Sequence, residues 1–303
     1  MISRRRPAHW AHDRDYFYKY MNCSAAKAVL TNRTLKWSPA STFNDPFDMQ
    51  FDLHLDFDAD ELVGLCKKDF KDIVLGRRGF EPNVGLGNVL ARLQVIAPRV
   101  PAAKLDHFVE DSLRLVVNNV PADMVPMHNQ LREHFGTYKI LCLSERNDSL
   151  LMWSHYADQH RGIVCRLACL EETDSSWSVA KPINYTETMP RFVNQQELRD
   201  LITGQADLRR ESIVERTIFS KAMDWQYEKE WRVYIPTRTK NDEFLNFHTN
   251  ELAAVYFGCR IADIDREEIA KLARSINPVV KLFAATKARR DFAIEFEPFH
   301  HRG

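Results

Sequence analysis

The spacing of the apolar residues changes twice along this chain, and these changes constrain its fold more than any other feature. Near the N-terminus, residues 16–20 and 34–38 alternate in the manner of strands. From Asp58 to about Phe135, apolar residues recur at helical spacing, and after Lys139 the strand pattern returns. The chain therefore has strand-forming segments at both ends and a helical segment between them.

The other segments complete this alternation. Further helices are predicted at 24–30, 149–157, 194–223 and 263–275. Further strands are predicted at 139–144, 162–168, 180–185, 231–235, 244–248, 253–258, 279–284 and 292–297. We therefore predict an α+β fold: a mixed, largely antiparallel sheet with flanking helices, in which residues 58–135 form a helical insertion after the N-terminal strands. No linker-like composition marks a boundary, so residues 1–303 are predicted to form a single domain.

The composition limits the partners and cofactors that we expect. The 42 Lys and Arg residues balance the 42 Asp and Glu residues, so no net charge draws the protein to nucleic acid or to an anionic membrane. We find neither a secretory signal nor an apolar stretch long enough to span a bilayer, and expect a cytoplasmic protein without a membrane partner. The 6 cysteines form no Cys-x-x-Cys pair and the 11 histidines no His-Glu-x-x-His motif, so we predict neither disulfides nor a metal site.

The segment 228–232 carries the clearest chemical pattern. In the strand predicted there, Trp231, Val233 and Ile235 form an apolar face, which places Glu230 and Arg232 on the opposite face. Glu228 joins that polar face if the strand starts early. Two carboxylates beside an arginine would stabilise positive charge that develops on a sugar carbon. The alternative is an edge strand whose polar face is solvated and whose Glu230 and Arg232 pair with each other.

Two other clusters gather polar and aromatic side chains. In the short helix predicted at 149–157, Ser154, His155 or Tyr156 would line a ligand cleft; alternatively, Trp153 and Tyr156 lie in the core with their polar tips satisfied. Asn44 and Asp45 precede a proline, which favours a turn held by side-chain bonds to backbone amides, with contact to a ligand as the alternative.

An ordered set of motifs resembles the bacterial and phage family of unknown function numbered 2971. The set runs from about residue 16 to residue 260. It comprises Tyr18-Lys19-Tyr20, Trp37-Ser38-Pro39, Phe43-Asn44-Asp45-Pro46-Phe47, Cys142-Leu143-Ser144, residues 152–157 with His160 and Gly162, and residues 221–232. This resemblance identifies relatives and implies no particular chemistry. Relatives of this kind suggest a part in phage defence or in a toxin system.

The chain is more distantly similar to ADP-ribosyltransferases. In that family an early strand carries an aromatic, His or Arg position, a middle position is Ser or Tyr, and a late strand carries a Glu. Lys19 or Tyr20, Ser154 or Tyr156, and Glu230 would take these positions, and Glu228 would complete a Glu-x-Glu. The first strand has no plain His or Arg, no Ser-Thr-Ser motif is present, and the middle residue lies on a predicted helix.

This second resemblance implies NAD as the cofactor and ADP-ribosyl transfer or NAD hydrolysis as the reaction. Glu230 would stabilise the cation formed as nicotinamide leaves, with Glu228 and Tyr156 as its catalytic partners. The nucleotide would contact Lys19, Tyr20, Asn44, Asp45, Ser154, His155 and Arg232, with Lys19 or Arg232 on the pyrophosphate. The acceptor would be a protein or a nucleic acid. The neutral chain favours a protein or a small acceptor, whereas local basic segments such as 209–210 and 287–290 keep nucleic acid open.

Two other functions compete with this one. A nucleotide-binding sensor or interaction module would use the same aromatic and basic residues without catalysis. A nuclease would use Glu228, Glu230 and a histidine, but it needs a carboxylate-bound Mg²⁺ and the cluster shows no Asp at a convincing spacing, so it ranks third.

Overall fold

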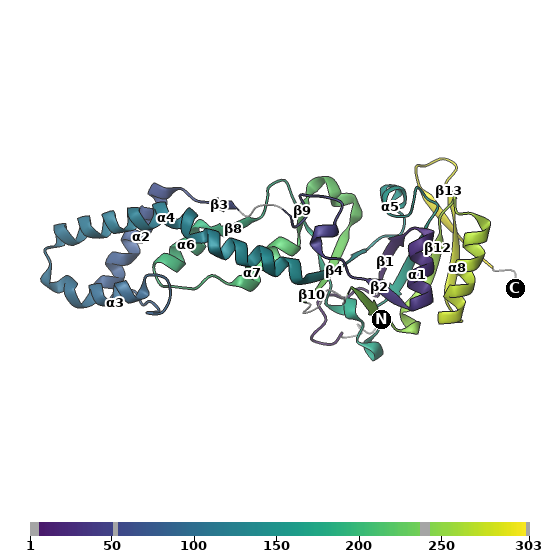
Figure 1. Cartoon of the computed structure of the whole chain (residues 1–303), viewed down its shortest axis with the longest axis horizontal. Coiled ribbons are helices and arrows are strands. Elements are labelled where there is room, and N and C mark those ends of the chain that lie inside the picture. The colour runs from purple at the N-terminus through teal and green to yellow at the C-terminus, as the bar shows by residue number, and fades with distance from the viewer. Residues whose placement is uncertain (1–5, 51–53, 237–242, 301–303) are drawn as a thin grey trace. The chain divides into compact units, whose positions relative to one another are not determined.

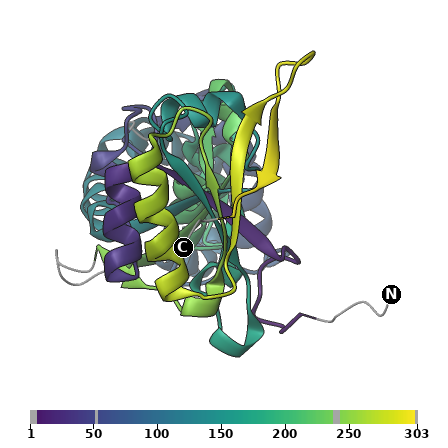
Figure 2. The ribbon, with the colours of Figure 1, turned by 90° about the vertical axis from the view of Figure 1, so that its right-hand side faces the viewer.

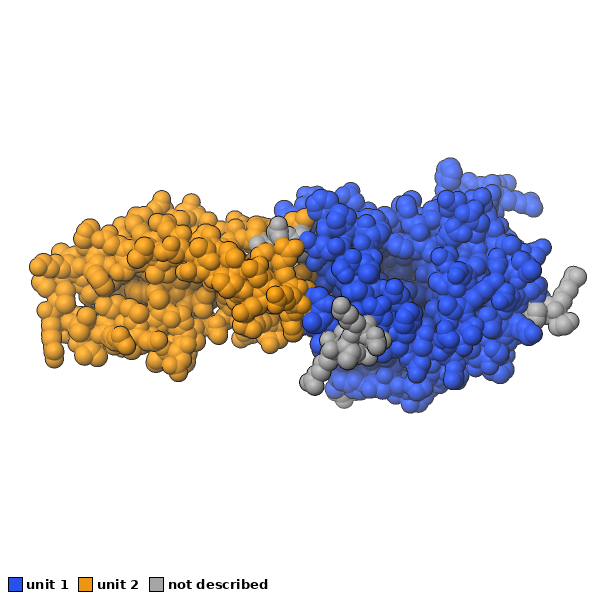
Figure 3. Space-filling model, in the orientation of Figure 1, with its two compact units in different colours: residues 1–50, 136–188, 219–303 blue, residues 51–135, 189–218 orange. Residues whose placement is uncertain are grey.

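A computed structural model describes residues 6–50, 54–236 and 243–300, and the chain in it forms two compact units. Unit 1 comprises residues 1–50, 136–188 and 219–303, and unit 2 comprises residues 51–135 and 189–218 (Figures 1 and 3). The segment predicted as an insertion, 58–135, lies in unit 2. Residues 189–218 join it there, which the sequence pattern does not predict.

Unit 1 contains an eight-stranded sheet built from both ends of the chain. Its neighbouring strands run antiparallel except β12 and β13, which are parallel, and β6 and β10 pair over two residues only. The predicted α+β class, with a mixed and largely antiparallel sheet, is confirmed. The spatial order is β14 (Ile294–Pro298), β13 (Lys281–Lys287), β12 (Leu252–Phe257), β5 (Ile163–Ala168), β1 (Tyr16–Met21), β4 (Tyr138–Ser144), β10 (Glu230–Pro236) and β6 (Lys181–Pro182).

Two helices cover one face of this sheet. Strand residues of alternate parity, such as Phe17, Leu143 and Val255, form the main core with residues of α1 (Cys23–Asn32) and α8 (Asp263–Ile276). Figure 2 shows α1 in purple and α8 in yellow-green side by side on that face. α1 begins where the Asn22 side chain accepts a hydrogen bond from the Ala25 amide (2.7 Å).

Smaller elements complete unit 1. β2 (Thr34–Lys36) pairs with β11 (Phe244–Asn246), and β7 (Asn184–Thr186) pairs in parallel with β9 (Ser220–Ala222). The short helix α5 (Leu150–His155) begins at the cap residue Ser149, as predicted. Short 3-10 helices span Ala40–Thr42, Glu171–Thr173, Ser176–Val179, Met223–Glu228 and Thr249–Glu251.

Unit 2 is mainly helical. Its elements are β3 (His54–Asp56), α2 (Ala59–Val74), α3 (Gly87–Ile96), most of α4 (Ala102–Thr137), β8 (Arg191–Asn194), α6 (Gln195–Ile202) and α7 (Arg210–Ile218), and a 3-10 helix spans Ala97–Arg99. β3 and β8 pair in parallel. The buried Asp69 on α2 accepts hydrogen bonds from Arg78 and Arg199. None of the helices in the described ranges is both long and apolar enough to cross a membrane.

The single helix predicted at 194–223 is wrong. Residues Asn194 and Glu197 form a capping box that starts α6. Gly204, with φ of +66°, takes the left-handed conformation that commonly ends a helix, and α7 starts only at Arg210. Ser220–Ala222 then form a strand. The polar composition of the segment concealed this break.

Candidate functional site

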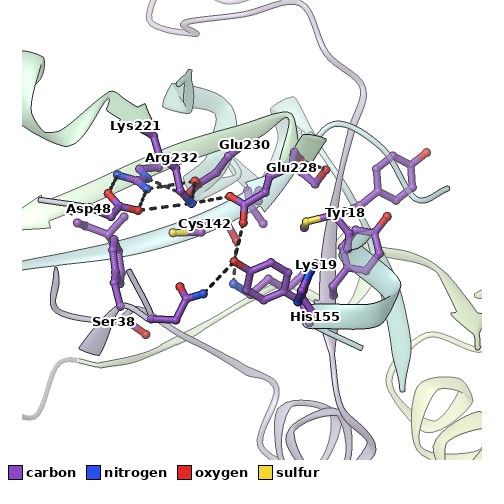
Figure 4. Close-up of a pocket in the computed structure, with 18 of the residues that line it drawn as sticks. Tyr18, Lys19, Ser38, Asp48, Cys142, His155, Lys221, Glu228, Glu230 and Arg232 are labelled. Atoms are coloured by element: carbon purple, nitrogen blue, oxygen red, sulfur yellow. Dashed lines mark hydrogen bonds and ion pairs between the residues drawn. The ribbon is translucent and has the colours of Figure 1, made fainter. Parts of the chain in front are cut away.

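A cavity of about 460 Å³ opens in unit 1 (Figure 4). Its walls come from β1, β4, β10, α5, the 3-10 helix before β10, and the segment between residues 38 and 48. Most of the site residues predicted from sequence line it. These are Lys19, Tyr20, Asn44, His155, Tyr156, Glu228, Glu230 and Arg232.

The cavity lies where the sheet splits between β1 and β4. Tyr18 and Ser144 form the register pair that joins these two strands. Further along β4, Ile140 pairs with Ser38 through two backbone hydrogen bonds of 2.9 Å. Between these two points the Lys19 ammonium donates a hydrogen bond to the Cys142 carbonyl (2.7 Å). The Lys19 side chain thus donates to a backbone carbonyl of β4 at a point where the two strands are not paired. The gap between the strands leaves room for a ligand.

Strand alternation directs the charged side chains of β10 into this gap. Glu230 and Arg232 are opposite Ser144 and Cys142 of β4, and all four line the cavity. Val233 lies in the main core, against which Trp231 packs. The predicted two-faced strand is therefore present. The alternative of a solvated polar face is wrong, but the pairing of Glu230 with Arg232 that it included is present. Glu230 is 5% exposed and Arg232 is 0% exposed.

Arg232 holds two carboxylates. Its guanidinium donates to both oxygens of Asp48 (2.9 and 2.5 Å) and to both oxygens of Glu230 (2.7 and 3.1 Å). It also lies over the Phe43 ring, 5.3 Å from the centroid. A guanidinium engaged in this way is not available to a pyrophosphate, so Arg232 positions the carboxylates instead.

Lys221 joins the same cluster from β9. Its ammonium lies 2.5 Å from Glu228, 2.9 Å from Glu230 and 3.4 Å from Asp48 (Figure 4). We call Asp48, Lys221, Glu228, Glu230 and Arg232 the ion cluster. All five residues are buried. The candidate site residues predicted from sequence did not include Asp48 or Lys221.

The ion cluster contains more carboxylates than cations. Among the residues that the structure describes, the cations paired with Asp48, Glu228 and Glu230 are Lys221 and Arg232. Burial and the neighbouring Glu230 raise the pKa of Glu228 to about 7, although Lys221 opposes this shift. Burial alone would also raise the pKa of Glu230, but Arg232 and Lys221 outweigh it and hold that pKa well below its usual range. Glu228 is therefore the carboxyl that exchanges a proton near neutral pH.

Tyr156 contacts Glu228 directly. Its hydroxyl donates to Glu228 Oε1 (2.5 Å) and accepts a long hydrogen bond from the Asn44 amide (3.5 Å). Burial and the charge of Glu228 raise the pKa of Tyr156 well above its usual range, so the tyrosine keeps its proton. The Glu228 carboxylate accepts two of these hydrogen bonds, one from Tyr156 and one from Lys221. The Glu230 carboxylate accepts three, one from Lys221 and two from Arg232. Glu228 therefore has more acceptor capacity left for a ligand.

A left-handed turn fixes the position of α5. Asp158, Gln159 and His160 have φ angles of 47°, 54° and 67°. The Gln159 amide donates a hydrogen bond to the Ser154 carbonyl, and the His160 amide donates one to the Trp153 carbonyl; both distances are 3.1 Å. A Cβ on Gly162 would lie 2.2 Å from the Met21 carbonyl of β1. The His160-x-Gly162 motif therefore holds α5 close to the end of β1.

The remaining residues of α5 divide between core and cavity. Trp153 is fully buried and its indole donates to the Asn147 carbonyl (2.7 Å), which agrees with the core alternative. His155 lines the cavity, and its ring centroid lies 6.1 Å from that of Tyr227. Ser154 does not line the cavity: its hydroxyl donates to Leu150 (2.9 Å) and lies 3.3 Å from His160 Nε2.

Asp45 also lies outside the cavity lining. Its carboxylate accepts a hydrogen bond from the Phe47 amide (2.8 Å), which is the turn that the sequence favours. Tyr20 lines the cavity, but its hydroxyl donates to the Arg146 carbonyl (3.0 Å) and its ring packs edge-on against Trp153. Lys19 has no acidic partner within ion-pair distance in the described ranges. It is therefore the cation in this cavity that is best placed to receive an anionic ligand.

The comparisons with known proteins agree with one of the two resemblances. A family model described as "Protein of unknown function (DUF2971)" matches residues 152–233. This range includes the last four residues of α5 and residues 221–232, but none of the earlier motifs of the set that begins at residue 16. No curated protein and no solved structure matches the chain.

Proposed function

We propose that this cavity binds NAD and that the protein is an ADP-ribosyltransferase-like enzyme or an NAD glycohydrolase. The observation that carries the proposal is Glu228. It is a buried carboxyl that ionises near neutral pH, it lies against the hydroxyl of Tyr156, and it lines a cavity of ligand size.

The lining of the cavity supports a nucleotide ligand. Tyr18, Phe43 and Tyr156 supply aromatic rings for a nicotinamide or adenine. Lys19, which has no acidic partner in the described ranges, supplies the charge for a pyrophosphate. This pairing of rings with an uncompensated ammonium suits a nucleotide better than an apolar ligand.

The reaction would proceed by loss of nicotinamide. The bond between ribose C1′ and the nicotinamide nitrogen breaks, and nicotinamide leaves with the bonding pair. The ionised Glu228 would stabilise the positive charge that remains on the ribose. Water or an acceptor nucleophile then bonds C1′ and gives up its proton to bulk water. Lys221 would position both Glu228 and Glu230, and Arg232 would position Glu230. In this mechanism Glu228 stabilises the cation, a role that the sequence analysis gave to Glu230.

Replacing Lys19 by methionine is expected to weaken the binding of ADP-ribose by about 10- to 100-fold, because a charge-assisted contact to phosphate is lost. Isothermal titration calorimetry measures the Kd, and release of nicotinamide from NAD by the wild-type protein tests the chemistry. Lys36→Met, at an exposed lysine outside the cavity lining, is the control. If wild-type protein binds neither NAD nor ADP-ribose, the proposal fails.

The pH dependence tests Glu228 separately. Only the ionised carboxylate stabilises the positive charge on the ribose. The rate of nicotinamide release is therefore expected to rise about tenfold between pH 6 and pH 8, around a midpoint near 7. Stability has the opposite sign. A carboxyl whose pKa is raised in the folded state stabilises the protein fully below its ordinary pKa, and this contribution disappears as pH rises through 7.

Denaturant titrations from pH 5 to pH 8 measure this linkage. The wild-type protein is expected to lose about 2.5 kcal/mol across this range relative to Glu228→Gln, which lacks the titrating proton. Parallel pH profiles for the two proteins would contradict the assignment.

A non-catalytic nucleotide sensor is the second candidate. The observation that favours it is the mutual engagement of Arg232, Glu230 and Lys221, which makes much of the charged wall structural. Binding of ADP-ribose without nicotinamide release would select it. A nuclease is less well supported, because the three carboxylates that a divalent cation would need are already paired with Lys221 and Arg232.

A further inference from the structure

The sheet face opposite α1 and α8 carries a row of aromatic side chains. Tyr16 and Tyr18 come from β1, and Tyr256, Phe283 and Phe296 come from β12, β13 and β14. The centroid of Tyr256 lies 6.2 Å from Tyr18 and 4.9 Å from both Phe283 and Phe296. We call these five residues the aromatic face. Tyr16 is 40% exposed, and Tyr18, Phe283 and Phe296 are partly exposed.

Three cations belong to the same face. Arg166 on β5 is the register partner of Tyr18, and its guanidinium lies over the Tyr16 ring at 4.6 Å. Lys281 and Lys287 share the parity of Phe283 on β13, and both are exposed. None of the three has an acidic partner within ion-pair distance in the described parts of the chain. Arg166 Nε is buried there without a hydrogen-bond partner.

Carboxylates lie at one end of this face, where Asp13, Asp15 and Glu145 line a hollow together with Tyr16 and Tyr18. Asp15 is paired with Arg6, and Glu145 is paired with Arg14. At the other end, on β14, Glu295 and Glu297 alternate with Ile294 and Phe296 and therefore point to the opposite side of the sheet. Toward β13 and β14 the face is thus aromatic and basic although the whole chain is neutral.

We propose that the aromatic face binds single-stranded nucleic acid. Unpaired bases would stack on the four exposed or partly exposed rings, whereas Tyr256 is buried beneath them. Phosphates would contact Arg166, Lys281 and Lys287. An acidic peptide would satisfy the cations but not the rings, and a duplex hides the base faces that stack. Tyr18 also lines the cavity, so a bound strand lies next to the ligand site. If the proposed NAD chemistry holds, which this last step requires, the strand is the acceptor.

Fluorescence anisotropy with a labelled 12-nucleotide single strand tests the charge contribution. Lys281→Glu/Lys287→Glu is expected to weaken binding at least about tenfold and to reduce the salt slope by about two. The matched control, Lys271→Glu/Arg274→Glu, makes the same charge change at exposed positions of α8, on the covered side of the sheet. An equal loss in both variants, or no binding of the wild-type protein at low salt, overturns the proposal.

The stacking contribution needs its own variant. Tyr16→Leu is expected to weaken binding about tenfold, whereas Phe244→Leu, at an exposed aromatic on β11, is expected to have no effect. Equal affinity for the duplex of the same sequence would also contradict stacking. Strand binding without nicotinamide release would leave this inference standing and overturn the NAD chemistry. Nicotinamide release without strand binding would do the reverse.

Discussion

Replacing Arg232 by methionine is expected to lower the free energy of unfolding by about 3 to 5 kcal/mol, which is the usual cost of removing one partner from a buried ion pair. Arg232 is 0% exposed and contacts both Asp48 and Glu230. Methionine fills similar space, so the loss comes mainly from carboxylates left without a counter-charge. Asp48 loses its closest cation, and Lys221 alone must compensate three acids.

Urea denaturation followed by circular dichroism measures this loss. Arg114→Met removes an arginine from exposed ion pairs in unit 2 and is expected to have little effect. If Arg232→Met does not accumulate as folded protein, Asp48→Asn offers a milder break in the same contact. A stability close to the wild-type value in both cluster variants would show that the ion cluster does not hold this part of the sheet.

Replacing Glu228 by glutamine is expected to reduce nicotinamide release by about 100- to 1,000-fold, on the scale of losing one preorganised charge-stabilising group. Glutamine preserves the shape and the hydrogen bond from Tyr156 but cannot oppose a developing cation. Because a pKa of about 7 leaves the Glu228 carboxyl protonated in about half of the molecules at neutral pH, the neutral variant is expected to fold.

Chromatographic detection of nicotinamide and a melting curve on the same sample separate chemistry from folding. Glu187→Gln, at an exposed position between β7 and β8, is the control. Glu230→Gln is expected to melt at a lower temperature than the wild-type protein, because the Glu230 carboxylate accepts hydrogen bonds from Arg232 and Lys221. Wild-type turnover in a folded Glu228→Gln protein would remove Glu228 from the mechanism.

Alternation predicted the parts of the site that depend on one strand. Trp231 and Val233 required a core, so Glu230 and Arg232 had to share the other face of β10. The strands at both ends and the helical segment from residue 58 followed from apolar spacing in the same way. Such features are local, and a single sequence carries them.

The remaining features depend on contacts between distant segments. Asp48 meets Arg232 only because the segment before unit 2 folds back beside β10, and no pattern around residue 48 indicates this partner. At the split between β1 and β4, the hydrogen bond from Lys19 to the Cys142 carbonyl likewise joins segments that are far apart in the sequence. Side-chain spacing likewise suggested that the polar face was as compatible with solvent as with a cavity, because burial is decided by the neighbours.

The order of the ion cluster along the chain has a consequence for synthesis on the ribosome. Asp48 emerges before all of unit 2, whereas Lys221 and Arg232 emerge after it. Until then, the carboxylate of Asp48 stays hydrated, because a buried charge without its partner is unfavourable. β4 also lacks its neighbouring strand, since β10 has not yet been synthesised. A nascent chain that stops before residue 221 therefore has no assembled cavity.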